Sequence, residues 1–452
     1  MTFEDYLPYY KRNLRIAGPV VLSQLGGSIT QLADNIMVGH LGTVELAAVS
    51  FANTIFIIGM LFSIGITMAS TPLIGQAYVQ GEHTKLTSYL QNSLLQVILT
   101  AIVISALLFA LYSFMDDMGQ EADVVELAKP YYILLVISLF PFLIFCFFKQ
   151  FLEGLGSTKH AMIITIICNI VNIVLNYFLI FGTYGFPKWG IIGAGVATLL
   201  SRVLMPIMFL IIICKKADWW MFFSRFGKKV FSFKVLRELH SLGLPIAGQM
   251  VLEISAFAFS AIMVGWLGAV PLASHQIAQN ISTIAFMAVL GISTATTIRV
   301  SHQLGLRDFK ALRMAASASI HLCLATNFIL GLLILSFRYI IPMAFTEDAA
   351  VIELAAQLLL FVGLFQLFDG MQSVGIGILR GLTDVKRPVI YAFISYICIN
   401  LPIGYIFAFV FKMGAAGIWL GFVFGLGVAA ILFHIRYRKR INELESAYYK
   451  TC

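Results

Sequence analysis

The sequence carries little charge for its length. Only 12% of its 452 residues are Asp, Glu, Lys or Arg, whereas 60% are hydrophobic and the mean hydropathy is +0.91. Soluble proteins are usually about 25% charged and about 45–50% apolar. A chain of this composition could not hide its apolar side chains from water, so a soluble fold is excluded and the surrounding solvent must be lipid.

Motifs for catalysis and cofactor binding are also lacking. The chain has no G-x-x-x-x-G-K-[ST] phosphate loop and no H-E-x-x-H zinc motif. Its six cysteines are scattered, mostly within apolar runs, so we interpret them as packing residues rather than disulfides or metal ligands. No nucleophile and base are arranged as an enzyme would need. We therefore expect a protein that is not an enzyme and that holds no cofactor.

Long apolar runs dominate what is present. Only helices or closed barrels satisfy backbone polar groups in lipid, and a helix needs about 20 apolar residues to span the hydrocarbon. No alternating strands of barrel type occur. The sequence therefore predicts an all-α polytopic membrane protein with twelve transmembrane helices, near 15–38, 47–75, 89–114, 129–153, 160–182, 190–214, 240–266, 273–298, 314–340, 350–379, 388–411 and 414–436.

The basic residues predict the orientation. If the N-terminus is inside, 24 of the 30 Lys and Arg residues fall in the inner segments. The outer loops hold four, Lys129, Lys188, Arg338 and Lys412. Basic residues concentrate in cytoplasmic loops, so both termini are predicted in the cytoplasm of a multi-pass protein. The same rule accounts for the formal net charge of +8 without a nucleic-acid partner.

The chain also contains an internal repeat. Pro19 and the run Ile36–Gly42 recur as Pro245 and Ile262–Gly268, both at an offset of 226 residues. Six predicted spans separate the copies, and an even number gives both halves the same orientation, as in a parallel repeat. We therefore expect two parallel-repeat six-helix bundles.

The repeat and the charge pattern together predict the domains. The segment 1–214 is the N-terminal six-helix bundle, and 240–436 is the C-terminal one. Between them, 215–239 mixes aromatic and basic residues, as expected of a cytoplasmic linker on the inner leaflet. The segment 437–452 is expected to be a cytoplasmic tail.

Three acidic residues lie inside predicted spans: Asp34, Glu253 and Asp369. A charged carboxylate at the bilayer centre costs about 2.5–3.5 kcal/mol on insertion scales. No Lys or Arg lies at comparable depth in the same helices, so we expect the missing positive charge to arrive as a cation or a proton. The offset pairs Asp34 with Ser260 and Glu253 with Gly27, so the repeated scaffold does not require the acids.

Other residues could complete such a site. Asn172 and Asn176 are four residues apart and share one helical face, as do Ala194 and Thr198. Amide, hydroxyl and freed backbone oxygens are hard cation ligands, although helix–helix hydrogen bonding accounts for the Asn pair equally well.

Prolines and aromatic residues also recur near the acids. Pro19 and Pro245, at paired positions in the two copies, are candidate helix hinges. Aromatic and sulfur side chains cluster around the acids, and a few facing inward would suit a lipophilic organic cation: Phe257, Phe259, Phe361, Phe365, Phe368 and Met371.

These residues resemble a known family. The run Gln31–Gly42, with Pro19 upstream, resembles the first span of the multidrug and toxic compound extrusion (MATE) transporters of the NorM-type branch. Gly154–Lys159 and Gly190–Thr198 look like loops of the same family, and the resemblance covers essentially the whole chain. It implies efflux of organic, often cationic, drugs in exchange for inward Na⁺ or H⁺ by alternating access.

The resemblance also implies roles for individual residues. Asp34 looks like the acid of the N-lobe cation site, and Glu253 and Asp369 look like the C-lobe acids. The other N-lobe cation-site positions are Asn172, Asn176, Ala194 and Thr198. Phe365 stands where a tyrosine is expected, and its lack of a hydroxyl argues against a C-lobe sodium site.

The surroundings and the rival functions follow from the same likeness. The protein is expected to be a monomer in the bacterial inner membrane, in contact with lipid and with small organic cations. A lipid-linked saccharide flippase of the same superfamily is the nearest alternative, but it would require cationic residues facing the cavity. A polytopic membrane enzyme is the more remote alternative.

Overall fold

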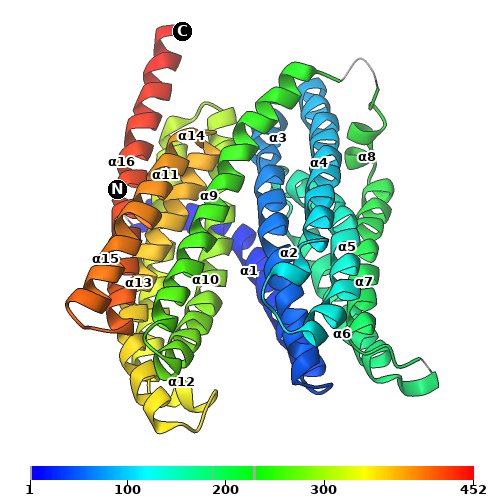
Figure 1. Cartoon of the computed structure of the whole chain (residues 1–452). Coiled ribbons are helices and arrows are strands. Elements are labelled where there is room, and N and C mark those ends of the chain that lie inside the picture. Colours follow the sequence, from blue (N-terminus) through cyan, green and yellow to red (C-terminus); the bar gives the residue numbers. More distant parts are fainter. Residues whose placement is uncertain (1–2, 186, 228–230, 452) are drawn as a thin grey trace. The chain divides into compact units, whose positions relative to one another are not determined.

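The computed structural model describes residues 3–185, 187–227 and 231–451, and this part of the chain is helical with no strand. Figure 1 shows the helices. The long ones are α1 (Phe3–Gly39), α2 (Thr43–Thr67) with α3 (Ser70–Val79), α4 (His83–Tyr112), α5 (Ala122–Gly154), α6 (Lys159–Phe181), α7 (Ile191–Lys215), α9 (Phe233–Gly265), α10 (Ala269–Gly305), α11 (Phe309–Ser336), α13 (Ala349–Gly381), α14 (Lys386–Phe393) continued by η3 (Ile394–Asn400), α15 (Leu401–Tyr405) and η4 (Ile406–Val410), and α16 (Ala415–Thr451). The short ones are η1 (Met115–Asp117), η2 (Thr183–Gly185), α8 (Ala217–Phe223) and α12 (Ile340–Met343).

The predicted all-α membrane fold is confirmed. Among the described residues, eleven helical segments are long and apolar enough to cross a bilayer. The long helix α1 is not one of them, although its stretch 16–33 contains no charged residue. With α1 the long segments agree with the predicted twelve spans.

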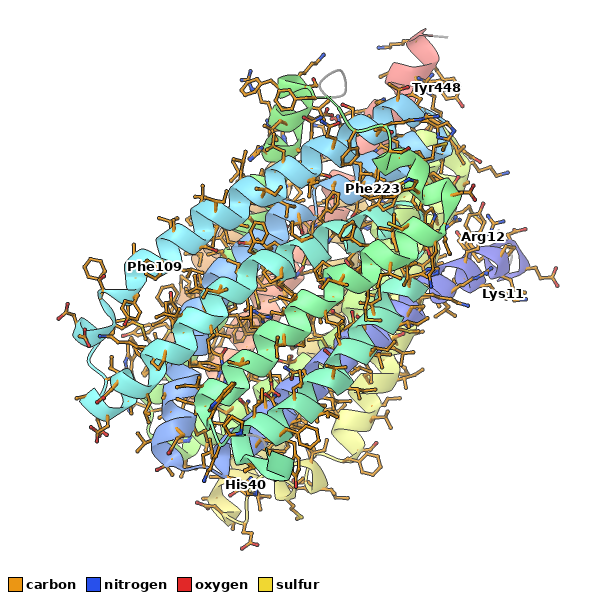
Figure 2. All side chains as sticks on the ribbon, turned by 90° about the vertical axis from the view of Figure 1, so that its right-hand side faces the viewer. Lys11, Arg12, His40, Phe109, Phe223 and Tyr448 are labelled. Carbon is orange, nitrogen blue, oxygen red and sulfur yellow. The ribbon has the colours of Figure 1, made fainter. Side chains whose placement is uncertain are left out.

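The outer faces of the helices are apolar. On α4, Leu107 and Phe109 are each 58% exposed, and Phe109 projects from the bundle in Figure 2. Lipid tails are as apolar as these side chains, so their exposure has no cost in a bilayer. Apolar side chains therefore cover the outer faces of the helices, whereas in a soluble protein most of them would be buried.

The helices form two compact units. Unit 2 is Leu22–Ala247, and unit 1 is Met1–Val21 together with Gly248–Cys452. The two borders lie 226 residues apart, and each falls two residues after a paired proline, Pro19 or Pro245. Both α1 and α9 nevertheless remain helical through their proline.

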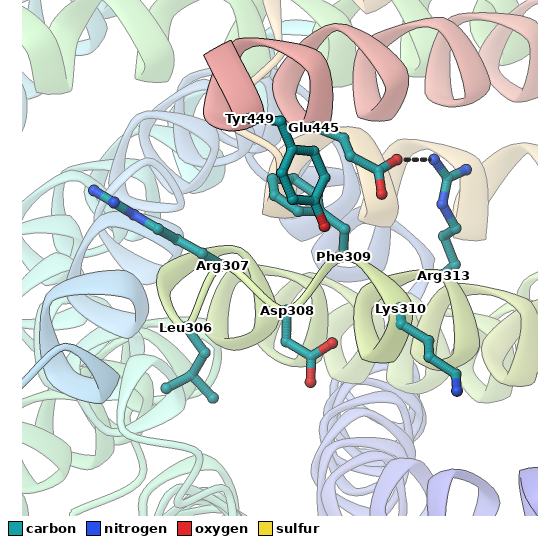
Figure 3. Close-up of a pocket in the computed structure, with 8 residues that line it drawn as sticks. All are labelled: Leu306, Arg307, Asp308, Phe309, Lys310, Arg313, Glu445 and Tyr449. Atoms are coloured by element: carbon teal, nitrogen blue, oxygen red, sulfur yellow. Dashed lines mark hydrogen bonds and ion pairs between the residues drawn. The ribbon is translucent and has the colours of Figure 1, made fainter. Parts of the chain in front are cut away.

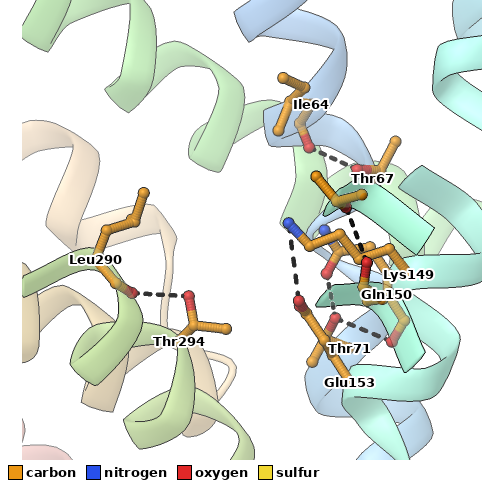
Figure 4. A network of polar contacts seen from close by, with 10 residues as sticks. Ile64, Thr67, Thr71, Lys149, Gln150, Glu153, Leu290 and Thr294 are labelled. Carbon is orange, nitrogen blue, oxygen red and sulfur yellow. Dashed lines mark hydrogen bonds and ion pairs between the residues drawn. The ribbon is translucent and has the colours of Figure 1, made fainter. Parts of the chain in front are cut away.

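Each unit is organised around one central helix. In unit 2, α5 packs against α2, α3, α4 and α7, and in unit 1, α13 packs against α10, α11 and α16. A contact to the central helix recurs in both units. The Thr71 hydroxyl donates to the backbone oxygen of Gln150 at 3.3 Å (Figure 4), and the Thr297 hydroxyl donates to the backbone oxygen of Gly377 at 2.9 Å.

Glycines allow close helix packing at the unit borders. Within unit 2, a Cβ placed on Gly65 of α2 would lie 2.5 Å from the Cα of Ala247 on α9. Within unit 1, a Cβ on Gly291 of α10 would lie 3.0 Å from the backbone oxygen of Ala17 and 3.2 Å from the backbone nitrogen of Val21, both on α1. Gly65 and Gly291 are again 226 residues apart, so the same close approach is built twice.

Four turns share one hydrogen-bond pattern. After α3, α5, α10 and α13, a residue with positive φ donates its N–H to the carbonyl three residues earlier, and the next residue donates to the carbonyl five residues earlier. This is the Schellman pattern of helix ends. The positive φ falls on Gly81 and Gly156 in unit 2, but on Arg307 and Thr383 in unit 1, where a side chain costs roughly 1–2 kcal/mol.

The ends of the predicted bundles also contain helix. The predicted linker 215–239 holds α8 and the start of α9, and the predicted tail 437–452 continues α16 as far as Thr451. Phe222 of α8 is buried in unit 2, and Phe223 packs edge-to-face on Phe151 of α5 with ring centroids 5.4 Å apart. Apart from this placement, the predicted domain boundaries stay predictions.

Ion pairs fasten α16 to unit 1. Arg436 pairs with Asp384 at 2.5 Å, and both side chains are 9% exposed. Arg313 of α11 pairs with Glu445 at 2.5 Å (Figure 3). These contacts keep the charged end of α16 in place next to α11 and α14.

Candidate functional site

The first candidate site lies in unit 2, where α1 meets α6. The side-chain amide of Asn176 donates to an Asp34 carboxylate oxygen, and it also donates to the Asn172 amide oxygen at 3.1 Å. The Asn172 amide in turn donates to the Ser201 hydroxyl on α7 at 3.3 Å. The structure thus joins three of the predicted N-lobe residues into one chain of hydrogen bonds.

An oxygen within this chain has no donor. Asn176 is fully buried, and its Oδ1 has no hydrogen-bond partner among the described residues. A buried acceptor without a donor costs about 1–3 kcal/mol. Beside the Asp34 carboxylate, this oxygen is an additional ligand that a small cation could use.

Of the two predicted residues of α7, Thr198 joins this network through its backbone oxygen, and Ala194 does not take part in these hydrogen bonds. The Ser201 hydroxyl, which accepts from Asn172, donates to the backbone oxygen of Thr198 at 2.9 Å. Ala194 is buried one turn before Thr198. Helix α7 lies close to α6 at Gly193, where any Cβ would collide with the backbone oxygen of Leu179. Glycine has no Cβ, so it permits this close approach.

Arg202 is a neighbour that the sequence argument did not identify. It lies within electrostatic range of Asp34 and donates to the Ser138 hydroxyl of α5 at 2.8 Å. Its guanidinium also lies over the rings of Phe142 and Phe56, at 4.9 and 5.4 Å from their centroids. The prediction considered basic residues only in α1, α9 and α13, the helices that carry the acids. Arg202 belongs to α7, so it was not considered. Its position four residues after Thr198, on the same helical face, was the available signal.

The second candidate site lies in unit 1 around Glu253 of α9 and Asp369 of α13. Asp369 is 3% exposed and lies within electrostatic range of Glu253. The Gln372 amide donates to the Tyr396 hydroxyl at 2.5 Å and approaches a Glu253 carboxylate oxygen at 3.5 Å. The structure therefore brings the two C-lobe acids together.

Three residues of this second site were not predicted. Gln372 follows Asp369 by three residues, so it shares a helical face with that acid. Tyr396 lies in η3, a π-helical segment, and such segments often occur at functional sites. Arg380 donates to the Gln249 amide oxygen at 3.5 Å and lies within electrostatic range of Glu253. Basic side chains therefore lie within electrostatic range of two of the acids, Arg202 near Asp34 and Arg380 near Glu253.

Phe365 is part of the apolar core rather than the wall of an open site. It is 1% exposed and packs edge-to-face against Trp419, with ring centroids 5.5 Å apart, and against Phe257 at 6.4 Å. It lies one turn before Asp369 on α13. Its phenyl ring offers an apolar surface beside the acids and no oxygen ligand.

The geometry suits one small cation rather than a metal cluster. Throughout the described ranges, no three His, Cys, Asp or Glu side chains group as they would around a metal ion. Each candidate site instead combines one or two carboxylates with neutral amide or hydroxyl groups. Such sites can bind a monovalent cation or a proton and release it again.

Comparison with known proteins identifies the scaffold. The MatE family model matches this chain twice, over residues 19–178 and 245–406. The two matches begin at Pro19 and Pro245, so the repeat found in the sequence is a repeat of the family unit.

Curated relatives match almost the whole chain. The multidrug resistance protein NorM of Vibrio cholerae serotype O1 is 34% identical over 426 residues, 93% of each chain. The multidrug resistance protein NorM of Photobacterium profundum is 32% identical over 440 residues, 96% of each chain.

Solved structures share the fold. A multidrug resistance MATE family transporter of the MOP superfamily in its outward-facing conformation superposes with a TM-score of 0.89 at 23% identity, covering 97% of both chains. The eukaryotic MATE transporter AtDTX14 superposes with a TM-score of 0.87 at 21% identity, covering 98% of this chain and 99% of its own. With the two family matches and the full-length NorM relatives, these comparisons show that the chain belongs to the MATE family of transporters, in its NorM-type branch.

Proposed function

We propose that this protein exports organic, often cationic, drugs in exchange for inward Na⁺ or H⁺, by alternating access of a central site to the two sides of the membrane. The names of its full-length relatives, multidrug resistance proteins NorM and MdtK, support the drug class. The scaffold supports the mode of transport, because parallel repeats commonly rock about a site at their interface.

The observation that carries this proposal is the Asp34 network. The site contains a carboxylate inside the membrane and the buried oxygen of Asn176, which has no donor. Together these oxygens can bind a cation, whereas an apolar group beside them would leave them without partners. Na⁺ would take these oxygens directly. H⁺ would bind the carboxylate and leave the Asn176 oxygen to a water or a drug donor.

Arg202 adjusts the affinity of this site. Its guanidinium repels a cation at Asp34, but it is held by Ser138 and by two aromatic rings rather than by the carboxylate. A fixed positive charge within electrostatic range of Asp34 weakens ion binding without replacing the ion. Weak binding favours release on the inner side, which a transport cycle requires.

The acids of unit 1 serve the same exchange. Glu253 and Asp369 lie close enough that their negative charges oppose each other, so one bound proton or cation stabilises the pair. The half-buried ring of Phe257, which packs against the buried Phe365, is suited to a lipophilic cation. In this scheme an ion and a drug compete for the same negative charge, so binding of each promotes release of the other.

The energetics are sufficient for export. One inward charge gains about 2.3 kcal/mol per 100 mV of membrane potential. Since about 1.4 kcal/mol corresponds to a tenfold ratio, one-for-one exchange with a neutral drug sustains about a 50-fold gradient. We place the protein in the bacterial inner membrane, as a monomer with both termini in the cytoplasm.

The test is drug transport in proteoliposomes with sodium and proton gradients imposed separately. Ethidium or norfloxacin export should follow one or both gradients, and Asp34→Asn should abolish the ion-driven component while the protein still inserts. Asp117→Asn, at an exposed position at the end of η1, is the matched control and should transport normally. Ion-driven export that is unchanged in Asp34→Asn would refute the role of Asp34.

A further inference from the structure

Two nitrogens of one buried arginine have no acceptor. Arg299 of α10 is 7% exposed, and its Nε and Nη2 have no hydrogen-bond partner in the ranges that the structure describes. Three other arginines that interact within the units do have one: Arg202 donates to Ser138, Arg380 to Gln249 and Arg436 to Asp384. Removing an arginine from water without an acceptor is costly, so Arg299 needs an explanation.

The two N–H groups without partners are arranged to receive one ligand. Nε and Nη2 form one edge of the planar guanidinium, and their N–H bonds point in parallel. This edge matches the two oxygens of a carboxylate or a phosphate, which bind arginine in a bidentate manner. The missing acceptor therefore has the shape of an oxyanion.

The nearby charges favour an anion as well. The side chains that act most strongly on Arg299, other than by burial, are those of Arg12 and Tyr9 on α1. Arg12 lies near the N-terminal end of α1 (Figure 2). Two positive charges in each other's range repel unless an anion lies between them.

The packing of the two helices explains why these residues meet. Gly291 of α10 touches Ala17 and Val21 of α1, so the helices lie side by side there within unit 1. Arg299 is eight residues further along α10, about 12 Å at 1.5 Å per residue. Because Arg12 precedes Ala17 on α1, the helices run antiparallel, and they carry both arginines toward the predicted cytoplasmic side.

The scaffold does not require an arginine at this position. The offset of 226 that pairs Gly65 with Gly291 and Thr71 with Thr297 pairs Leu73 with Arg299. Leu73 is 5% exposed, so in unit 2 an apolar side chain fills the equivalent place. The arginine is therefore an addition to the repeated fold rather than a part of it.

We propose that Arg299 and Arg12 form an oxyanion site within unit 1, which takes a carboxylate or phosphate group between α1 and α10. Arg299 supplies the bidentate contact, and Arg12 supplies the second positive charge. The bound oxyanion links the first turns of α1 to α10. Its source is either a soluble anion or the phosphate of an anionic lipid headgroup.

The experiment measures the thermal unfolding midpoint of the purified full-length chain in neutral detergent. The probes are inorganic phosphate, acetate and phosphatidylglycerol, each titrated at constant ionic strength with chloride as the reference salt. The test variant is Arg299→Leu, which installs the side chain found at the repeat-related position. Arg12→Gln tests the second charge, and Arg338→Gln, a half-buried arginine in a predicted outer loop, is the control.

The proposal predicts a reversal of sign. Without an oxyanion, Arg299→Leu should unfold at the same or a higher temperature than the unmodified chain, because it removes a buried charge without an acceptor. With a saturating oxyanion the unmodified chain should unfold at the higher temperature, Arg12→Gln should need more than tenfold more ligand, and Arg338→Gln should respond normally. Stabilisation by phosphate and acetate identifies a soluble ligand, and stabilisation by phosphatidylglycerol alone identifies a lipid.

Two results would overturn the proposal. Equal stabilisation of the unmodified chain and of Arg299→Leu by every probe would mean that any anion binds elsewhere. A lower midpoint for Arg299→Leu at all anion concentrations would mean that the arginine is only a packing residue. Neither result depends on drug transport, so the proposed function is tested separately.

Discussion

The glycine packing at the unit borders gives the sharpest prediction. In Gly65→Ala, the new Cβ would lie 2.5 Å from the Cα and 2.8 Å from the nitrogen of Ala247. Carbon atoms in contact normally lie about 3.5–4.0 Å apart. Because the obstructing atoms are backbone, no rotamer change can relieve the contact, and α2 must move away from α9 by about 1 Å.

The size of the effect follows from two terms. Overpacking a well-packed site costs about 1–3 kcal/mol. Replacing a glycine inside a helix by alanine gains about 0.8–1.0 kcal/mol in helix propensity. Gly427→Ala on α16 receives the same gain without the cost, because its Cβ would meet Phe368 at 3.5 Å, an ordinary contact. The difference between the two variants therefore isolates the steric term, about 1–3 kcal/mol in favour of Gly427→Ala.

The assay is thermal unfolding of both variants in the same detergent and lipid. A unit of this size shifts its midpoint by about 2–4 °C per kcal/mol, so Gly65→Ala should unfold about 2–12 °C below Gly427→Ala. Adding Ala247→Gly to Gly65→Ala should restore little, since the conflict is with backbone atoms. Equal midpoints for the two single variants would show that α2 and α9 are not packed this closely, and the reasoning would fail.

Three further predictions concern single contacts. Asn176→Ala should raise the concentration of coupling ion needed for half-maximal drug export by tenfold or more, because it removes an oxygen beside Asp34; an unchanged ion dependence would exclude Asn176 as a ligand. Arg436→Met should lower the free energy of unfolding by about 3–5 kcal/mol, since it leaves the buried Asp384 carboxylate without its partner, and a change below about 1 kcal/mol in denaturant titration would contradict this. Thr383→Gly should raise the unfolding midpoint, because Thr383 holds φ at 56° where a side chain costs roughly 1–2 kcal/mol, and a lowered midpoint would show that its side-chain contacts outweigh the strain.

The membrane fold, the repeat and the identity of the membrane acids were determined by sequence alone. Composition shows that the chain lies in lipid, because a sequence with so few charged residues could not form a soluble fold. The repeat was readable because Pro19 and Pro245 keep their spacing to long matching runs. The acids were recognisable because a charged carboxylate in a long apolar run raises the free energy of membrane insertion, whichever way the side chain points.

The neighbours of those acids were decided by tertiary structure. Arg202 comes close to Asp34 from a helix far along the sequence, and the approach of Arg380 to Glu253 depends on how α9 and α13 pack. The position of a residue along its own helix cannot reveal such pairs, because the opposite charge lies on a different helix.

Helix packing also decided which oxygens are available. The assignment of the part of α1 before Leu22 to unit 1 depends on packing against α10 rather than on local sequence pattern. In the same way, the side-chain N–H of Asn176 reaches Asp34 only because α1 and α6 come close together. This arrangement leaves the side-chain oxygen of Asn176 without a donor. Hydropathy and spacing set which segments enter the bilayer. Distances of a few ångströms between side chains, which only the packed helices fix, set which groups can hold an ion.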